Sequence, residues 1–173
     1  MLNALKRLFA KKPHYKPGPP PPPRLVISQG CIDALAPCLA PEIRNGQEGI
    51  VYLLGQSDGT TTVALAAIRP EAQVTRGSFV VSVPAMAKVV RAEVDRGLQV
   101  VGQIHTHPGD AFHSDGDEDG AHIAFTGYAS VVLPDYGRHL PALTRAAAYV
   151  FQAGKGFVPL GAPNIVIVPG RVA

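Results

Sequence analysis

Residues 103–119 read QIHTHPGDAFHSDGDED, and this stretch carries the strongest indication of fold and chemistry in the chain. His105 and His107 stand two positions apart at the end of an apolar run. Because side chains alternate along a strand, both imidazoles are expected on one face. Pro108 then ends the strand, and Asp117 follows ten residues after His107. Two histidines and a carboxylate can hold a tetrahedral metal and leave a fourth position for water, as catalytic sites do.

Each part of this stretch is common when it stands alone. A single His-x-His is usually an accident of the surface or the core, and an acidic run such as 115–119 is usually a solvated loop. The combination is more specific than its parts, because His-x-His-Pro at a strand end is followed by Ser-x-x-Asp at 114–117.

The motifs HTHP at 105–108 and SDGD at 114–117 resemble the signature of the JAMM (JAB1/MPN/Mov34) metalloproteases. That family also needs a glutamate at the start of a strand after the first helix, and Glu48 stands in this place. The resemblance covers roughly residues 25–170 and includes the order helix, glutamate, hairpin, helix and His-x-His strand. It therefore implies an MPN/JAB-like fold.

The resemblance also implies the roles of the site residues. One zinc ion per chain is bound by His105, His107 and Asp117, although iron or manganese would suit the same ligand types. Glu48 accepts a proton from the attacking water and later delivers it to the leaving amine. Ser114 donates a hydrogen bond to the developing oxyanion.

The loop between His107 and Ser114 is one residue shorter than is usual in the family, as in bacterial members that accompany ubiquitin-like conjugation genes. Asp117 keeps the Ser-x-x-Asp spacing and is the predicted third ligand, with Asp119 and His113 as the alternatives. If His113 is not a ligand, it lines the groove. The remaining candidates, His122 and His139, are interpreted as structural or exposed.

The substrate expectation comes from the same resemblance. JAMM proteases cut isopeptide or peptide bonds after the C-terminal glycine of ubiquitin or a ubiquitin-like protein, whose extended tail fits a groove by strand addition. Expected partners are a ubiquitin-like protein, its conjugates and proteins of the conjugation pathway. Three alternatives stay open: a JAMM peptidase acting on a sulfur-carrier protein or short peptides, a non-catalytic MPN-type scaffold, and an adventitious metal site beside a functional N-terminal tail.

Charge is distributed unevenly along the 173 residues. Residues 1–24 hold six of the 16 basic residues and no acidic one, so the rest of the chain is net negative. The basic pI therefore belongs to the tail and does not indicate a body that binds nucleic acid. The chain has no Trp, 6 Phe and 5 Tyr, a composition poor in groups for base stacking.

The sequence divides into a basic, proline-rich tail at 1–24 and one MPN/JAB-like metalloprotease domain at 25–173. Five prolines at 19–23 favour an extended polyproline II spacer. Residues 1–12 are either a docking helix for a partner or an anionic membrane surface, or a solvated terminus. The solvated terminus is favoured because a single short helix binds weakly alone.

Cysteine usage and hydropathy predict a cytoplasmic protein without a membrane partner. Cys31 and Cys38 cannot make a disulfide framework and are interpreted as core thiols. No run reaches the roughly 18 apolar residues that span a bilayer. Basic residues between Lys6 and Lys12 interrupt any signal-peptide core.

Hydrophobic patterning predicts the α/β class, with a mixed β-sheet flanked by helices. Predicted strands are 24–28, 49–55, 61–68, 78–83, 98–104, 129–133, 146–152 and 164–168. Predicted helices are 31–39, broken by Pro37 and stopped by Pro41, then 84–96, and a short helix or turn at 121–127. Residues 109–120 are predicted as a loop.

Overall fold

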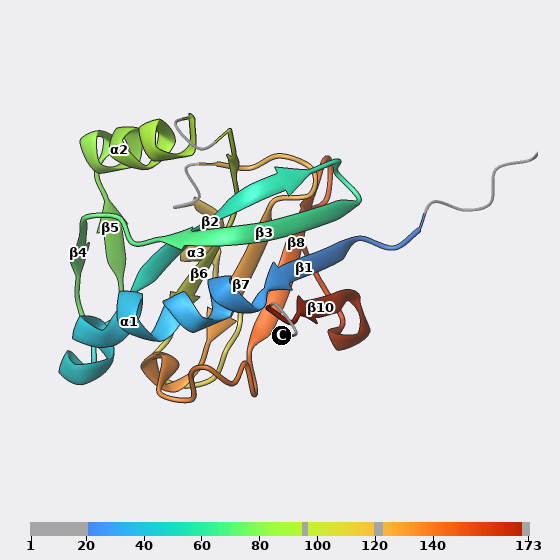
Figure 1. Cartoon of the computed structure of the whole chain (residues 1–173). Helices are drawn as coiled ribbons and strands as arrows, with labels where there is room; N and C mark the ends of the chain where they lie inside the picture. Colours follow the sequence, from blue (N-terminus) through green and yellow to red (C-terminus); the bar gives the residue numbers. More distant parts are fainter. Residues whose placement is uncertain (1–20, 95–96, 120–122, 171–173) are drawn as a thin grey trace, which may run out of the picture.

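A computed structural model describes residues 21–170 except 95–96 and 120–122 (Figure 1). Its main feature is a mixed sheet of eight described strands in the order β10-β1-β3-β2-β6-β7-β8-β9. These strands are β1 Arg24–Ser28, β2 Ile50–Ser57, β3 Thr61–Ile68, β6 Gln99–Thr106, β7 Ala129–Leu133, β8 Ala147–Gln152, β9 Gly156–Pro159 and β10 Ile165–Val168. The predicted fold class, a mixed sheet flanked by helices, is confirmed.

This sheet combines parallel and antiparallel pairs. β1 runs parallel to both β10 and β3, and β6 runs parallel to β7. The neighbours β2–β3, β2–β6, β7–β8 and β8–β9 are antiparallel. A Cβ atom at Gly55 would lie 1.7 Å from the carbonyl oxygen of Val63, so the hairpin β2–β3 needs glycine at its register shift.

Helix α1, Gln29–Asn45, differs from its prediction because it continues through Pro37 and Pro41. The Ser28 side chain caps its start, and Gly46 ends it at φ 62°. Each internal proline removes one helical hydrogen bond. Burial of one face of the helix outweighs this loss, and Pro37 itself is exposed, so it displaces no core side chain. The buried residues of that face are Cys31, Ile32, Leu35, Leu39 and Glu42.

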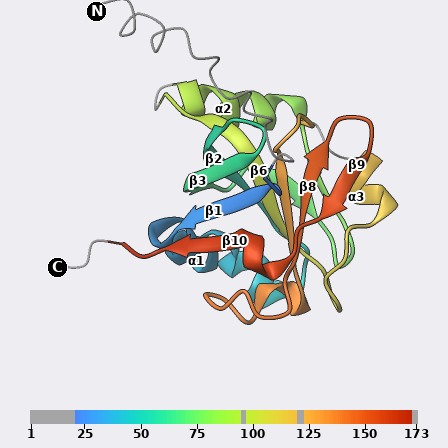
Figure 2. The same ribbon diagram turned by 90° about the vertical axis from the view of Figure 1, so that its right-hand side faces the viewer.

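Helix α2, Val83–Val94, packs with a small two-stranded sheet on the opposite side from α1 (Figure 2). That small sheet pairs β4, Ala72–Val74, with β5, Phe79–Val81. One core cluster lies between the main sheet and α1, and the other lies beneath α2 and β5. The main sheet therefore carries a core on each face, which fits its nearly continuous apolar strands.

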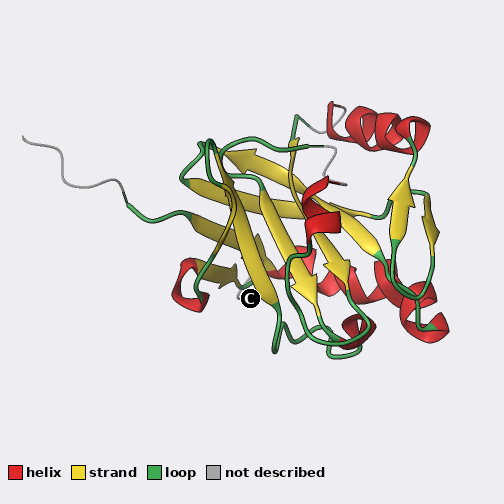
Figure 3. Ribbon diagram, turned by 180° about the vertical axis from the view of Figure 1, so that it is seen from behind, coloured by secondary structure: helices red, strands yellow, loops and turns green. Residues whose placement is uncertain are grey.

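Further elements depart from the sequence prediction. Helix α3, Asp115–Asp119, lies inside the stretch expected to be a loop. In Figure 3, which views the molecule from the side opposite to Figure 1, α3 is the short helix that lies over the strands. Of the short helix or turn predicted at 121–127, residues 126–127 form a turn, 123–125 have no regular structure, and 121–122 lie outside the described residues. The short strands β4 and β9 were not predicted.

The predicted core thiols are free cysteines, with Cys31 buried and Cys38 half-buried. Burial raises the pKa of Cys31 to about 11. Residues 1–20 of the predicted tail lie outside the described residues, so the tail stays a prediction. Within the described ranges, no helix is long and apolar enough to cross a membrane.

Candidate metal centre

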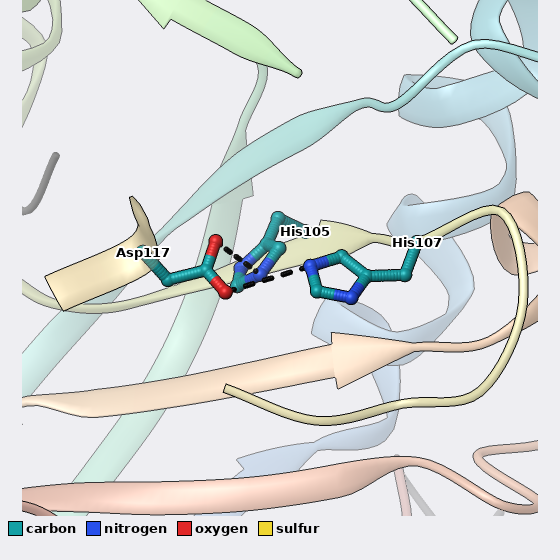
Figure 4. Close-up of side chains that lie close together, drawn as sticks. All are labelled: His105, His107 and Asp117. Carbon is teal, nitrogen blue, oxygen red and sulfur yellow. Dashed lines mark ion pairs between the residues drawn. The ribbon is translucent and has the colours of Figure 1, made fainter. Parts of the chain in front are cut away.

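Three predicted ligands meet at the end of β6. His105 lies in β6, His107 directly follows it, and Asp117 comes from α3 (Figure 4). Nε2 of His105 lies 3.1 Å from Oδ1 of Asp117, and Nε2 of His107 lies 3.5 Å from Oδ2. The three ligand atoms all lie within 4.8 Å of one another.

These distances fit a metal ion. Ligand atoms about 2.0–2.2 Å from a tetrahedral zinc lie about 3.3–3.6 Å apart, close to the two nitrogen–oxygen distances. His105 is fully buried, yet within the described part of the chain neither of its ring nitrogens has a hydrogen bond of good geometry. A buried nitrogen left without a hydrogen bond costs free energy that a bound cation would remove.

The charge states of the ligands suit the same ion. Burial lowers the pKa of His105, which favours the neutral imidazole that binds metals. Burial by itself would raise the pKa of Asp117, but its interactions with His105 and His107 outweigh burial and hold that pKa well below the usual range. A neutral histidine beside an ionised carboxylate is the state from which no proton must be displaced.

Ser114 fixes the position of Asp117. Its backbone N–H and its hydroxyl both donate to Oδ2 of Asp117, at 2.7 and 2.8 Å. The N–H of Asp117 donates back to the Ser114 hydroxyl at 3.2 Å. Ser114 therefore caps α3 and orients the carboxylate at the same time. Its only hydroxyl hydrogen is directed at Asp117, so the predicted oxyanion role requires that bond to be exchanged.

Glu48 lies in the same cavity as His107 and Asp117, on the short segment between α1 and β2. Its backbone N–H donates to the carbonyl of Thr75 at 2.8 Å. Gly49, the next residue, donates to the buried hydroxyl of Thr106 at 2.9 Å. Burial raises the pKa of Glu48 to about 6, His107 opposes this rise and Asp117 adds to it. A carboxyl with this pKa can exchange protons near neutral pH.

A groove of about 720 Å³ joins the ligand group to β5. One wall is the segment 77–81, and the other is the loop that follows β6. Residues on these walls and the floor include Glu48, Tyr52, Gln103, His107, Ser114 and Asp117.

The segment after β7 holds the loop of His107 through two residues with left-handed backbone. Asp135, at φ 54°, donates its N–H to the Gly109 carbonyl at 3.0 Å. Tyr136, at φ 57°, donates its N–H to the His107 carbonyl at 2.8 Å and its hydroxyl to the Arg76 carbonyl at 2.9 Å. Such backbone conformations are costly outside glycine and gather at functional sites.

The two other histidines that the structure describes, His113 and His139, do not belong to the ligand group. The centre of the His113 ring lies 4.4 Å from that of the Phe157 ring and 5.1 Å from that of the Tyr149 ring. His113 therefore supports the loop and is not one of the ligands. His139 is exposed and pairs with Asp135 at 2.8 Å, which confirms its prediction. His122 and the side chain of Asp119 lie outside the described residues.

Sequence reasoning missed Thr106 and Tyr136. Thr106 had a visible signal, because it is a polar residue inside an apolar strand, between the two histidines. The role of Tyr136 depends on a positive φ that the sequence around it does not reveal.

No family model matches this chain. The probable metalloprotease y4jG of Sinorhizobium fredii (strain NBRC 101917 / NGR234) is 30% identical over 134 residues, which cover 75% of this chain and 82% of the relative. Among solved structures, protein DSY2949 from Desulfitobacterium hafniense aligns at a TM-score of 0.62 and 14% identity, over 84% of this chain and 94% of its own. A JAB1/MPN domain protein from Archaeoglobus fulgidus aligns at a TM-score of 0.48 and 16% identity, over 84% of this chain and 98% of its own.

The solved structure with the higher TM-score shares the fold of this chain. The relative from Sinorhizobium fredii extends the likeness over most of both sequences. The HTHP and SDGD motifs, 105–108 and 114–117, are close in sequence, and their ligands meet in space. On these grounds, the chain belongs to the JAMM (JAB1/MPN/Mov34) metalloprotease family.

Proposed function

We propose that this JAMM-type metal-dependent hydrolase binds one zinc ion at His105, His107 and Asp117 and cleaves the bond after the C-terminal glycine of a ubiquitin-like protein. The reaction is deconjugation of a modified target or maturation of a precursor. One observation carries this proposal: Glu48 and two of the three ligands, His107 and Asp117, line the same groove, and that groove extends along β5.

The edge of β5 supports an extended peptide as the substrate. Among the described strands, β5 pairs with β4 alone. The N–H of Thr75 donates to the Ser78 carbonyl at 2.8 Å and closes the turn between the two strands. Because bonded and non-bonded pairs alternate in an antiparallel ladder, Phe79 directs its backbone N–H and carbonyl away from β4. A peptide in the groove can pair with these groups by strand addition.

Glycines on the groove walls support a substrate with a small terminal residue. Gly77 lies beside β5, and on the opposite wall Gly109 lies in the loop after β6 and Gly116 in α3. The Phe79 ring lies 5.5 Å from the His105 ring, which leaves little width beside the ligands. A chain that ends in glycine has no side chain to place at this narrow point.

The chain's own residues divide the chemistry between them. A zinc ion, when bound, supplies a Lewis acid and lowers the pKa of its water to about 7. Glu48 accepts a proton from the attacking water and delivers it to the leaving amine. Ser114 holds Asp117 in the resting state, and its hydroxyl turns to the developing oxyanion during the reaction.

The partners and location follow from this substrate. A ubiquitin-like protein, its conjugates and proteins of the conjugation pathway are the proposed partners. A reducing cytoplasm suits the free thiols of Cys31 and Cys38.

Elemental analysis combined with a cleavage assay tests the proposal. The wild type should contain about one zinc per chain and should cleave a ubiquitin-like fusion at a glycine-ended junction, and a chelator should stop the cleavage. His107→Ala should lose both metal and cleavage. His139→Ala is the matched control, because this histidine is exposed and lies outside the ligand group. A folded wild type without metal would refute the metal site, and zinc without cleavage of any fusion would refute the substrate.

A further inference from the structure

Two buried polar side chains lie side by side on the groove floor, away from the ligand group. Tyr52 on β2 and Gln103 on β6 stand directly opposite one another in the antiparallel register. They are 3% and 4% exposed, and both line the groove. None of the chemistry described for Glu48 or for the metal ligands uses either of them.

Both side chains have hydrogen-bonding capacity left over. The Tyr128 hydroxyl donates to Oε1 of Gln103 at 3.5 Å, which turns the Gln103 amide nitrogen the other way. Over the residues that the structure describes, no group accepts a hydrogen bond from that nitrogen or from the Tyr52 hydroxyl. Both donors lie on the floor of the groove, where a bound ligand that supplies an acceptor can pair with them.

The chemistry of this pair defines its ligand. A tyrosine hydroxyl and an amide NH₂ group can both donate, and a carbonyl oxygen has two lone pairs to accept them. None of the described residues that line the groove is a Lys or Arg that would favour an anion. The pair therefore suits a neutral carbonyl acceptor.

The distance along β6 defines where that acceptor lies on the substrate. Gln103 precedes the ligand His105 by two residues, and two residues of strand span about 6.6–6.8 Å. A peptide extended along β5 has the same repeat. When the scissile carbonyl of such a peptide lies at the ligand group, the carbonyl of the residue two positions earlier in the peptide lies beside Tyr52 and Gln103.

We propose that Tyr52 and Gln103 form a subsite that binds the backbone carbonyl of the residue two positions before the scissile glycine. This inference rests on the proposed function, because it requires that the part of the substrate before the scissile bond lies along β5. Tyr52 and Gln103 are then specificity-determining residues that favour a long, extended tail. They take no part in proton transfer.

Two matched fluorogenic peptides test the subsite. The first is acetyl-Ala-Gly-Gly-aminomethylcoumarin, and in the second an E-alkene replaces the Ala–Gly amide and removes its carbonyl together with its N–H. The kcat/KM of the wild type should be about 10-fold higher for the first peptide than for the second, as expected for one buried hydrogen bond. The difference should lie in KM. In Gln103→Met and Tyr52→Phe this ratio should fall towards one, while the alkene peptide is cleaved as by wild type.

Ser130→Ala is the control variant for this experiment. Ser130 stands opposite Gln103 on β7, is fully buried, and does not line the groove. The ratio of kcat/KM between the two peptides should be the same in Ser130→Ala as in the wild type. Equal losses on both peptides in Gln103→Met would show a structural role and would overturn the subsite, as would an unchanged ratio.

Binding of the product separates this inference from the proposed function. The acid acetyl-Ala-Gly-Gly and its alkene counterpart are titrated into the metal-loaded protein and followed by NMR. If wild type cleaves neither peptide but binds the first more tightly in a way that Gln103→Met abolishes, the subsite stands and the proposed reaction fails. If cleavage proceeds and the two products bind equally, the subsite fails and the reaction stands.

Discussion

The hydroxyl oxygen of Thr106 accepts a hydrogen bond of 2.9 Å from the backbone N–H of Gly49, and the Thr106 N–H donates in return to the Gly49 carbonyl at 3.0 Å. Thr106 stands between His105 and His107, and Gly49 follows Glu48. The two hydrogen bonds therefore tie the residue beside the proposed base to the strand end that carries two ligands.

Thr106→Val should lower kcat at least 10-fold while leaving the zinc content at that of wild type. The substitution keeps the shape of the side chain but leaves the buried N–H of Gly49 without an acceptor, at a cost of about 1–3 kcal/mol in unfolding free energy. Urea unfolding, elemental analysis and steady-state cleavage measure the three quantities. Thr106→Ser keeps the hydroxyl and should retain most of the activity; full activity in the valine variant would contradict the role.

Glu48→Gln should abolish turnover and leave metal binding intact, because an amide cannot accept the proton. In the wild type, the pKa of Glu48 is raised to about 6 by burial. Below that pH the carboxyl is protonated and cannot act as a base, so kcat/KM should fall as the pH drops through about 6. A pH–rate profile and the zinc content of both proteins measure this. A Glu48→Gln variant with near-normal turnover would mean that another group is the base.

Ser114→Ala should weaken metal binding by about 10–100-fold, the usual effect of removing a group that orients a ligand. The Ser114 hydroxyl donates to Asp117 at 2.8 Å, whereas its backbone N–H keeps its own bond in the variant. Competition with a zinc indicator gives the affinity. Asp115→Ala, an exposed position in the same short helix, serves as the control and should bind zinc as wild type does. An unchanged affinity for Ser114→Ala would remove the orienting role.

Tyr136→Phe should raise KM for peptide substrates about 3–10-fold with little change in kcat. The lost hydroxyl normally donates to the Arg76 carbonyl at 2.9 Å and holds the turn that precedes the groove wall. The N–H of Tyr136 keeps its bond to His107, so zinc content should not change. Steady-state kinetics measure the split, and a fall in kcat with loss of zinc would point to a different role.

Alkaline pH should destabilise the wild type more than Cys31→Ala. Burial raises the pKa of Cys31 from 9.0 to about 11, so the unfolded chain loses this proton first as the pH rises. Because the unfolded state then binds fewer protons than the folded state, stability falls between pH 9 and 11, by about 2–3 kcal/mol for this group. Unfolding free energies of both proteins at pH 8, 9 and 10 measure the difference. Parallel curves would show that the thiol does not contribute.

The sequence predicted the parts of the site that depend on local rules. Strand alternation places His105 and His107 on one face, and Ser-x-x-Asp spacing identified Asp117. Helix α3 was missed because Asp and Gly form helices poorly; Ser114 as its cap and acidic residues in its first turn make the helix possible.

Longer-range features could not be predicted in the same way. The helix α1 continues past Pro37 because tertiary burial exceeds the loss of a local bond. The pairing of Tyr52 with Gln103, which are 51 positions apart in the chain, depends on the register between β2 and β6, and the sequence does not specify that register.

The strand β10 lies beside β1 in the sheet (Figure 2), although Leu25 and its partner Ile165 are about 140 residues apart in the chain. A ribosome that adds about 5–20 residues per second delivers β10 roughly 7–30 seconds after β1. During that interval the outer edge of β1 has no strand to pair with and is open to other chains. The yield of folded protein therefore depends on the kinetics of translation and on chaperone capture as well as on the stability of the finished domain.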